Sequence, residues 1–242
     1  MSFISPDHLV VIARTLRDGV DYVADSLHAA PVLLPKVNDA ISSDDAVGAR
    51  LRLWNGLYID IVNVAEAANK VSKTMHAMPA ASADIQAAFP RRYGLDSTEM
   101  RLRAAQGPFL AHWVARVERP RQLRRWAAQY PRRLGTIRDM VHGQRPAHAT
   151  LDASGAFPTW RGAGDGLLPT LLQWNDATHP TASLPESGIA LKALRGFHPS
   201  PELIGEQLRW LGLDTILTVE PTLVEPSMFA EFETPSGIRT LK

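Results

Sequence analysis

The spacing of apolar residues in the first 80 positions predicts two long helices. Apolar side chains recur at alternating intervals of four and three residues, which is the period of one helix face. The first series is Leu9, Ala13, Leu16, Val20, Val23 and Leu27, and the second is Trp54, Leu57, Ile61, Val64, Ala68, Val71 and Met75. Ser5 and Pro6 supply a cap and a first helical position for the first series. We therefore predict an antiparallel pair of helices over 6–28 and about 47–77.

Residues 97–130 are predicted to pack beside that pair as further helices. Asp96 and Glu99 have the spacing of a capping box, and Gly107 with Pro108 interrupts the helix that follows. The apolar face after the break consists of Leu110, Trp113, Val114 and Val117. A short helix is predicted to begin at Pro120 and end at Pro131. Its inward-facing residues are Leu123, Trp126, Ala127 and Tyr130.

The remaining 100 residues lose the helical period. Glycine, proline and small polar residues interrupt the pattern over 143–184, and we predict an irregular Gly/Pro-rich connection there. A small α/β lobe is predicted over 185–242. Its elements are helices over 189–194 and 201–211 and a β-hairpin made from 215–219 and 228–233. The order also matches the latter half of a winged-helix module, although Glu202 and Glu206 do not suit a DNA-reading helix.

The expected fold class is therefore mainly α. It consists of a bundle-like helical domain over 1–142, which includes a basic segment at 91–145, followed by the connection and the C-terminal α/β lobe with its hairpin. A hydrophobic content of 45% in 242 residues is ample for a core. No stretch is long and apolar enough to span a bilayer, and charged residues interrupt the N-terminus where a secretory signal would be apolar. With no cysteine in the chain, we expect a cytoplasmic protein.

Charge changes this picture, because arginine is concentrated in one segment. Residues 91–145 hold 13 of the 26 basic side chains against four acidic ones, so the near-neutral total of +1 conceals a polarised chain. Arginine forks interleaved with aromatic rings suit phosphate groups and nucleic-acid bases. We predict that the phosphate backbone of DNA or RNA is contacted by Arg116, Arg119, Arg121, Arg124, Arg125, Arg132 and Arg133. The first hypothesis is thus a non-enzymatic nucleic-acid-binding protein.

Two other functions fit the same residues. The arginines could pair with acidic surfaces of the same chain, of a second copy or of a protein partner, which would make this an adaptor or subunit of a bacterial or phage assembly. Arg138 and His142 resemble the Arg and His pair of the HEPN ribonucleases, at a spacing one residue shorter. That resemblance implies a metal-independent ribonuclease with the pair at a helix end.

The first hypothesis includes no catalytic residue, and His142 would be catalytic only in the ribonuclease alternative. No metal site or cofactor site is predicted. Histidine and aspartate pairs that could begin a metal site, His142 with His148 and Asp176 with His179, lack a convincing third ligand. The glycine-rich loop at 162–166 has no preceding strand of the kind that a dinucleotide site requires.

Overall fold

The computed structural model describes residues 3–34, 48–64, 98–142, 145–151, 164–175 and 179–242, and within them the fold is mixed α/β with two sheets. The large sheet contains β1 (Ile4–Ala13), β2 (Val32–Leu34), β3 (Gly48–Arg52), β4 (Tyr58–Asn63), β5 (Phe109–Val117), β6 (Thr136–His142), β7 (Arg145–Leu151) and β8 (Thr170–Trp174). The small sheet contains β9 (Ala190–His198), β10 (Leu217–Pro221), β11 (Ser227–Thr234) and β12 (Gly237–Leu241).

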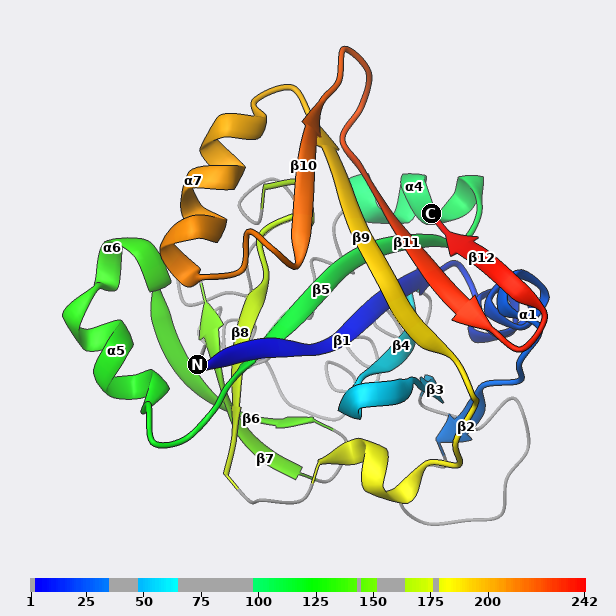
Figure 1. Cartoon of the computed structure of the whole chain (residues 1–242), viewed down its shortest axis with the longest axis horizontal. Helices are drawn as coiled ribbons and strands as arrows, with labels where there is room; N and C mark the ends of the chain where they lie inside the picture. The colour runs from blue at the N-terminus through cyan, green and yellow to red at the C-terminus, as the bar shows by residue number, and fades with distance from the viewer. Residues whose placement is uncertain (1–2, 35–47, 65–97, 143–144, 152–163, 176–178) are drawn as a thin grey trace, which may run out of the picture.

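Helices surround these sheets. They are α1 (Leu16–Leu27), α4 (Thr98–Gln106), α5 (Leu123–Gln129), α6 (Pro131–Leu134) and α7 (Pro201–Leu211), with short 3-10 turns η1 (Trp54–Gly56) and η3 (Pro180–Ser183). Figure 1 shows the small sheet in front of β1 and β5, with α1 on one side and α5, α6 and α7 on the other. None of the described helices is long and apolar enough to cross a membrane.

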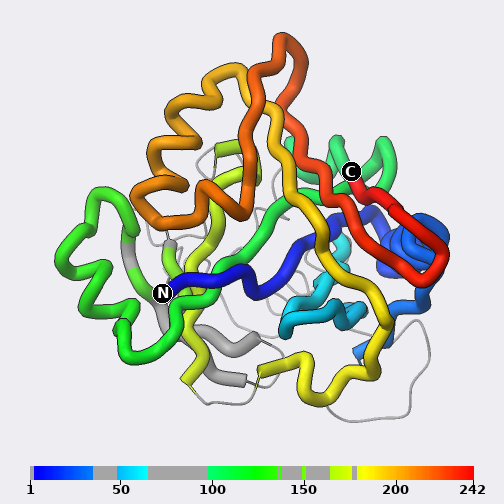
Figure 2. The backbone as a smooth tube through the Cα atoms, in the orientation of Figure 1, coloured from blue at the N-terminus to red at the C-terminus, as the bar shows by residue number. Residues whose placement is uncertain are grey.

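The large sheet consists of two halves with the same topology. Its strand order is β2-β3-β4-β1-β5-β8-β7-β6, and the antiparallel pair β1 and β5 forms the centre. In each half the central strand pairs in parallel with the fourth strand of that half, β1 with β4 and β5 with β8. Each half is therefore a βαβββ unit, with α1 in the first and α5 and α6 in the second. The central strands can be followed through the middle of Figure 2.

Each central strand carries a bulge directly before a histidine. The β1–β5 register passes from Pro6 to His8 with Asp7 as the extra residue, and Ala111 is the extra residue before His112. A bulge breaks the alternation of side chains, so two consecutive residues can face the same side of the sheet. The two histidines are equivalent in the β1–β5 pairing, because His8 lies opposite Val114 and His112 lies opposite Val10, so each histidine faces the residue two positions after the other.

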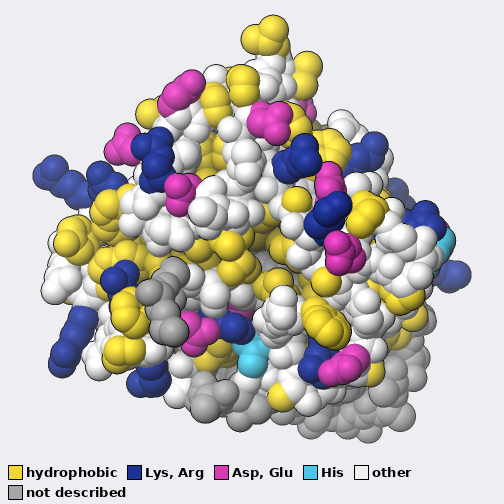
Figure 3. Space-filling model, viewed as in Figure 1, with side chains coloured by type: hydrophobic (Ala, Val, Ile, Leu, Met, Phe, Trp, Pro, Cys, Tyr) yellow, Lys and Arg dark blue, Asp and Glu magenta, His cyan; other side chains and the backbone are white. Residues whose placement is uncertain are grey.

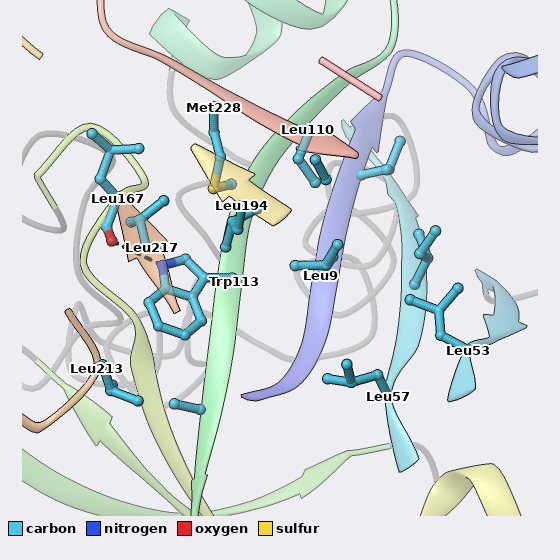
Figure 4. Close-up of a cluster of buried hydrophobic side chains, with 14 of the residues drawn as sticks. Leu9, Leu53, Leu57, Leu110, Trp113, Leu167, Leu194, Leu213, Leu217 and Met228 are labelled. Atoms are coloured by element: carbon cyan, nitrogen blue, oxygen red, sulfur yellow. Dashed lines mark hydrogen bonds between the residues drawn. The ribbon is translucent and has the colours of Figure 1, made fainter. Parts of the chain in front are cut away.

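Both faces of the large sheet are covered. Leu9, Val11 and Trp113 belong to the core between this sheet, α1 and the small sheet, and we call this side the outer face. Figure 4 shows Leu9, Leu110 and Trp113 meeting Leu194 and Met228 of the small sheet there. Val10 and Val114 lie in a second apolar cluster on the opposite side, the inner face.

The predicted helix over 6–28 is wrong in its first half. Residues 4–13 form strand β1, and the helix begins only at Leu16, where the Thr15 hydroxyl accepts a hydrogen bond of 3.1 Å from the Asp18 amide. The run from Leu9 to Ala13 is buried at every position. A strand covered on both faces has no alternating pattern, and its apolar residues match a helical spacing by chance.

The second predicted helix, over 47–77, is also wrong where the structure describes it. Residues 48–63 contain β3, η1 and β4, whereas 65–77 lie outside the described residues. Within 97–130, helices α4 and α5 and the break at Gly107 are confirmed. The segment 109–117 between them is strand β5. The prediction of a mainly α fold is therefore wrong.

The C-terminal part contains one confirmed helix and a different sheet. Helix α7 has the predicted bounds, but the helix predicted over 189–194 lies in strand β9. The expected hairpin strands exist as β10 and β11, yet β9 lies between them and β11 pairs with β12. Segment 143–184 contains strands β7 and β8. Division of the chain into independent units at 142/143 and 184/185 stays a prediction.

Candidate active site

A buried carboxylate on the inner face accepts hydrogen bonds from three rings. Asp7 is fully buried, and its Oδ1 lies 2.6 Å from His8 Nδ1. Its Oδ2 accepts from Trp174 Nε1 at 2.9 Å and lies 3.0 Å from His179 Nε2. The bulge of β1 places Asp7 beside His8, while Trp174 comes from β8 and His179 from the segment before η3. Three side chains, two of them from distant parts of the chain, thus converge on one carboxylate.

Asp7 is ionised at neutral pH. Burial alone would raise the pKa of its carboxyl group, because it disfavours the charged form. Hydrogen bonds from His179 and His8, together with the charges of these two imidazoles when protonated, outweigh burial and hold the pKa of Asp7 far below its usual value. The Asp7 carboxylate is therefore negatively charged at neutral pH although it is buried.

This charge fixes the tautomer of His8. An ionised carboxylate only accepts hydrogen bonds, so His8 Nδ1 carries the proton that it shares with Asp7. The other ring nitrogen, Nε2, is then the basic one. The His8 ring stacks on Tyr58, with 4.6 Å between ring centroids and 22° between planes, and the two residues pair in register between β1 and β4. Strand pairing and stacking hold the imidazole in one orientation.

The equivalent histidine of the second half, His112, is neutral. Its Nδ1 donates to the Gly166 carbonyl at 3.1 Å, and its Nε2 accepts from the Thr170 amide at 3.2 Å, with the Thr170 hydroxyl also within 2.9 Å. Burial lowers the pKa of His112 to about 4, against the raising effect of the Gly166 hydrogen bond, and the charge of His8 adds to the lowering. His112 is thus neutral at pH 7, and both of its ring nitrogens have hydrogen-bond partners within the chain.

A buried ion pair completes the polar groups around these rings. Arg50 Nε on β3 donates to Asp60 Oδ1 on β4 at 2.9 Å, and the Arg50 guanidinium lies 5.1 Å above the centre of the Tyr58 ring. We use the name inner-face polar cluster for Asp7, His8, Arg50, Tyr58, Asp60, His112, Trp174 and His179. Among the residues that the structure describes, no three His, Asp or Glu side chains are placed to hold a metal ion.

Chemically, the pair of Asp7 and His8 can accept and return a proton. The carboxylate orients the imidazole and stabilises the imidazolium that forms when Nε2 takes up a proton, as in other carboxylate-histidine pairs. The neighbouring His112 stays neutral and does not oppose this charge.

The seven arginines predicted to bind nucleic acid lie outside this cluster. Arg116 is on β5, Arg119 and Arg121 precede α5, Arg124 and Arg125 are on α5, and Arg132 and Arg133 are on α6. Several have partners within the chain: Arg116 Nε is 2.5 Å from Glu118, and Arg133 is 3.7 Å from Glu206. Figure 3 shows basic side chains at the edge of the molecule over α5, α6 and α7, with acidic ones nearby on α7. In this view acidic and apolar side chains lie between the basic ones.

The short helix α5 itself agrees with the sequence in its orientation. Leu123, Trp126 and Ala127 are buried, as predicted, whereas Tyr130 is 46% exposed. A depression of about 250 Å³ is lined by Arg121, Gln122, Arg125, Trp126, Gln129 and Tyr130. The Arg121 guanidinium lies 4.6 Å from the centre of the Trp126 ring, so the indole is covered by a side chain of its own protein.

The histidines named from the sequence have different outcomes. Residues 136–142 form a strand, so the predicted helix end at His142 is wrong, and the side chains of His142 and His148 lie outside the described residues. His179 does belong to the site, but its carboxylate partner is Asp7. Sequence reasoning missed Asp7 and His8. Their local signal is a pair of polar residues at the start of an otherwise apolar run.

Comparison with known proteins identifies the fold. The model of the glyoxalase-like domain family matches residues 7–212. No curated protein matches. A hypothetical protein from Staphylococcus aureus has a similar structure, with a TM-score of 0.50, 11% identity and coverage of 93% of this chain and 88% of that chain. Methylmalonyl-CoA epimerase from Mycobacterium tuberculosis matches with a TM-score of 0.35, 16% identity and coverage of 76% and 95%.

The family match contradicts the nucleic-acid-binding hypothesis, and the two-sheet fold contradicts the helical architecture on which that hypothesis depended. The arginines of 91–145 were predicted to lie on the outer faces of packed helices. Part of that segment is instead a central strand of a sheet whose buried polar groups face inward.

Proposed function

Because the chain belongs to the glyoxalase-like domain family, we propose that it is an enzyme that transfers a proton at a carbon atom next to a carbonyl group of a small molecule. The observation that carries this proposal is the ionised, buried Asp7 carboxylate bonded to His8 Nδ1. A buried carboxylate that orients an imidazole is an arrangement suited to general base catalysis. In this proposal His8 is the catalytic base, and Asp7 and His179 are its positioning residues.

The proton balance of the proposed step is simple. His8 Nε2 takes a proton from the carbon, the electron pair moves towards the carbonyl oxygen, and the imidazolium then returns a proton to the substrate. Asp7 stabilises the imidazolium, because opposite charges attract strongly where water is excluded. A neutral His112 supports the same step, since a second positive charge nearby would make His8 a weaker base.

The surroundings of the base favour a small substrate that is apolar in part. The inner face combines the polar cluster with the apolar side chains of Val10, Val114 and Leu172. Ligand sites of enzymes typically have such a lining, with few polar groups that fix orientation.

Deuterium exchange tests the proposal without knowledge of the substrate. The purified protein is incubated in D₂O with a panel of small aldehydes, ketones, 2-keto acids and thioesters, and incorporation at the carbon next to the carbonyl is followed by NMR. We expect exchange of at least one compound, and a loss of about a hundredfold or more in His8→Gln. His28→Gln is the matched control, because His28 is an exposed histidine at the end of α1.

Two outcomes would overturn the proposal. If a compound exchanges equally fast with His8→Gln, another group is the base. If compounds of the panel bind, as seen by ligand-detected NMR, and none exchanges, the protein is a small-molecule binding protein and not an enzyme of this class.

We also propose a cytoplasmic location and a homo-oligomeric state, neither of which depends on the catalytic proposal. The first is supported by the absence of cysteine from the chain, since disulfides accumulate in oxidising compartments. Light scattering coupled to size exclusion measures the second directly, by comparison with the monomer mass of 26.6 kDa.

A further inference from the structure

The turn at 164–166 has a backbone conformation that needs support from outside. Gly164, Asp165 and Gly166 have φ angles of +58°, +53° and +89°, three successive residues in the left-handed region. Asp165 is not a glycine, so this conformation carries strain that the surrounding structure must offset. A Cβ atom at Gly164 would lie 2.5 Å from Ile204 Cδ1 of α7, so the turn is also packed tightly against that helix.

One side-chain hydrogen bond ties the turn to the small sheet. Asp165 Oδ2 lies 3.0 Å from His198 Nε2, and both side chains are mostly buried. His198 Nδ1 accepts a hydrogen bond of 2.9 Å from the Ser200 amide, so its proton is on Nε2 and is donated to Asp165. His198 ends β9, and Ser200 precedes α7. The Asp165 carboxylate is thereby held at the corner between these two elements.

The same turn presents its carbonyl groups to two consecutive residues of β5. The Gly166 carbonyl accepts from His112 Nδ1 at 3.1 Å, and the Leu167 carbonyl accepts from the Trp113 indole at 2.8 Å. His112 is on the inner face and Trp113 on the outer face. Gly166 and Thr170 together occupy both nitrogens of the His112 ring. The position of this short segment therefore decides the orientation and the tautomer of His112.

We propose that Asp165 and His198 form a positioning pair that fixes the turn and, through the Gly166 carbonyl, holds His112 as the Nδ1-protonated neutral ring beside His8. The glycine-rich segment of the sequence thus has a role in the site, although it binds no nucleotide phosphate in this proposal. The small sheet, which contributes no residue to the inner-face polar cluster, would then act on the site through His198. The importance of His112 for catalysis rests on the proposed function, whereas the fixing of its ring does not.

Nitrogen-15 NMR of the histidine rings tests the pair without any substrate. The His112 signals are assigned by their absence in His112→Gln. In the wild type we expect a protonated Nδ1 and an unprotonated Nε2. Asp165→Gly removes the carboxylate and introduces a residue that adopts positive φ without strain. We expect this variant to populate both tautomers and to exchange the His112 ring proton with water roughly tenfold faster or more, as local opening becomes easier.

Two matched variants separate the pair from other roles of Asp165. Asp165→Asn tolerates the left-handed backbone and can still accept from His198, so it should restore the wild-type ring signals. Arg103→Met removes a cation whose pKa Asp165 influences and should leave His112 unchanged. The Trp174 indole signal, which reports the bond to Asp7, serves as the check that the inner face is intact.

The inference is overturned if Asp165→Gly folds, by circular dichroism and the Trp174 signal, and retains the wild-type tautomer and exchange rate of His112. It is equally overturned if Arg103→Met changes His112 as much as Asp165→Gly does. Failure of the deuterium-exchange experiment would reject the proposed function and leave this result standing. Where exchange activity is found, Asp165→Gly should lower kcat more than it changes KM.

Discussion

Trp174 donates its indole N–H to the Asp7 carboxylate across a strand to which neither residue belongs. The bond is 2.9 Å long and joins positions 167 residues apart. Asp7 is on β1 and Trp174 on β8, with β5 between them. The first strand of one half of the sheet is thus connected to the last strand of the other half through the buried charge of the candidate site.

Removal of this donor should destabilise the protein measurably. Trp174→Phe keeps an aromatic ring and deprives a buried carboxylate of one hydrogen bond, which costs about 1.5–3 kcal/mol for a charged acceptor. Urea unfolding at pH 7 gives the free energy. Trp54→Phe is the control, because Trp54 is 61% exposed and should change stability by only about 0.5 kcal/mol. Equal effects in both variants would contradict the role of the indole.

The neutral state of His112 predicts how stability depends on pH. The pKa of this group is about 4 in the folded protein and 6.5 in a model compound. Below pH 6.5 His112 becomes protonated in the unfolded chain, whereas in the folded chain it is protonated only near pH 4. The stabilisation that burial of the neutral ring brings is complete above pH 6.5 and is lost as pH falls towards 4. Its size is about 3 kcal/mol, at 1.4 kcal/mol per pH unit.

Comparison with His112→Gln isolates this contribution. Between pH 7 and pH 4 the wild type should lose about 3 kcal/mol more unfolding free energy than the variant, since the other titrating groups are common to both. Parallel pH profiles of the two proteins would show that the wild-type ring already takes up its proton near the usual pH.

Gly19→Ala should destabilise the protein, although helix propensity alone predicts the opposite. In a helix interior, alanine is favoured over glycine by about 1 kcal/mol. A Cβ at Gly19 would lie 2.6 Å from Ile61 Cγ2 and 3.1 Å from Ala13 Cβ, because α1 packs directly on the outer face of the large sheet. We expect Gly19→Ala to destabilise the protein by about 1–3 kcal/mol through overpacking.

A double substitution identifies the clash as the cause. Ile61→Ala removes the methyl group that a Cβ at position 19 would meet. Gly19→Ala with Ile61→Ala should therefore be more stable than the sum of the two single effects by about 1 kcal/mol or more. Simple additivity in urea unfolding would show that the two positions do not meet.

Removal of one member of the buried Arg50–Asp60 pair should lower the unfolding free energy strongly, whereas replacement of both by apolar residues should lower it little. Their side chains are 10% and 4% exposed and lie 2.9 Å apart. Arg50→Met leaves the Asp60 charge buried without this partner, which typically costs about 3–5 kcal/mol. Arg50→Met with Asp60→Leu removes both charges and should recover most of that loss. A double variant as unstable as the single one would show that the pair has net stabilising value.

The sequence predicted helices where a local signal decides the structure. Helix α7 begins with Pro201 at its first turn and ends at Gly212 in the left-handed conformation, and both signals can be read without tertiary information. The Arg14-Thr15 boundary inside the predicted helix 6–28 was missed. The apolar series from Leu9 to Leu27 runs through it without a break, although it crosses from a strand into a helix.

The candidate site was less accessible to sequence reasoning than the helices. Asp7 and His179 are 172 residues apart, and they meet only because of the order in which strands β1, β5 and β8 pair. The adjacent Asp7 and His8 were visible in the sequence. In a helix their side chains would point in directions 100° apart, and only a strand with a bulge places them on one face.

The two halves of the large sheet have the same topology but carry different residues at their bulges. The bulge before His8 is filled by an aspartate and the matching bulge before His112 by an alanine, which is fully buried. Each half therefore repeats the frame of a carboxylate-histidine pair, but only the first contains the acid. The two halves thus share one backbone frame but differ in polarity at the bulge: beside His8 lies a carboxylate, and beside His112 lies a methyl group.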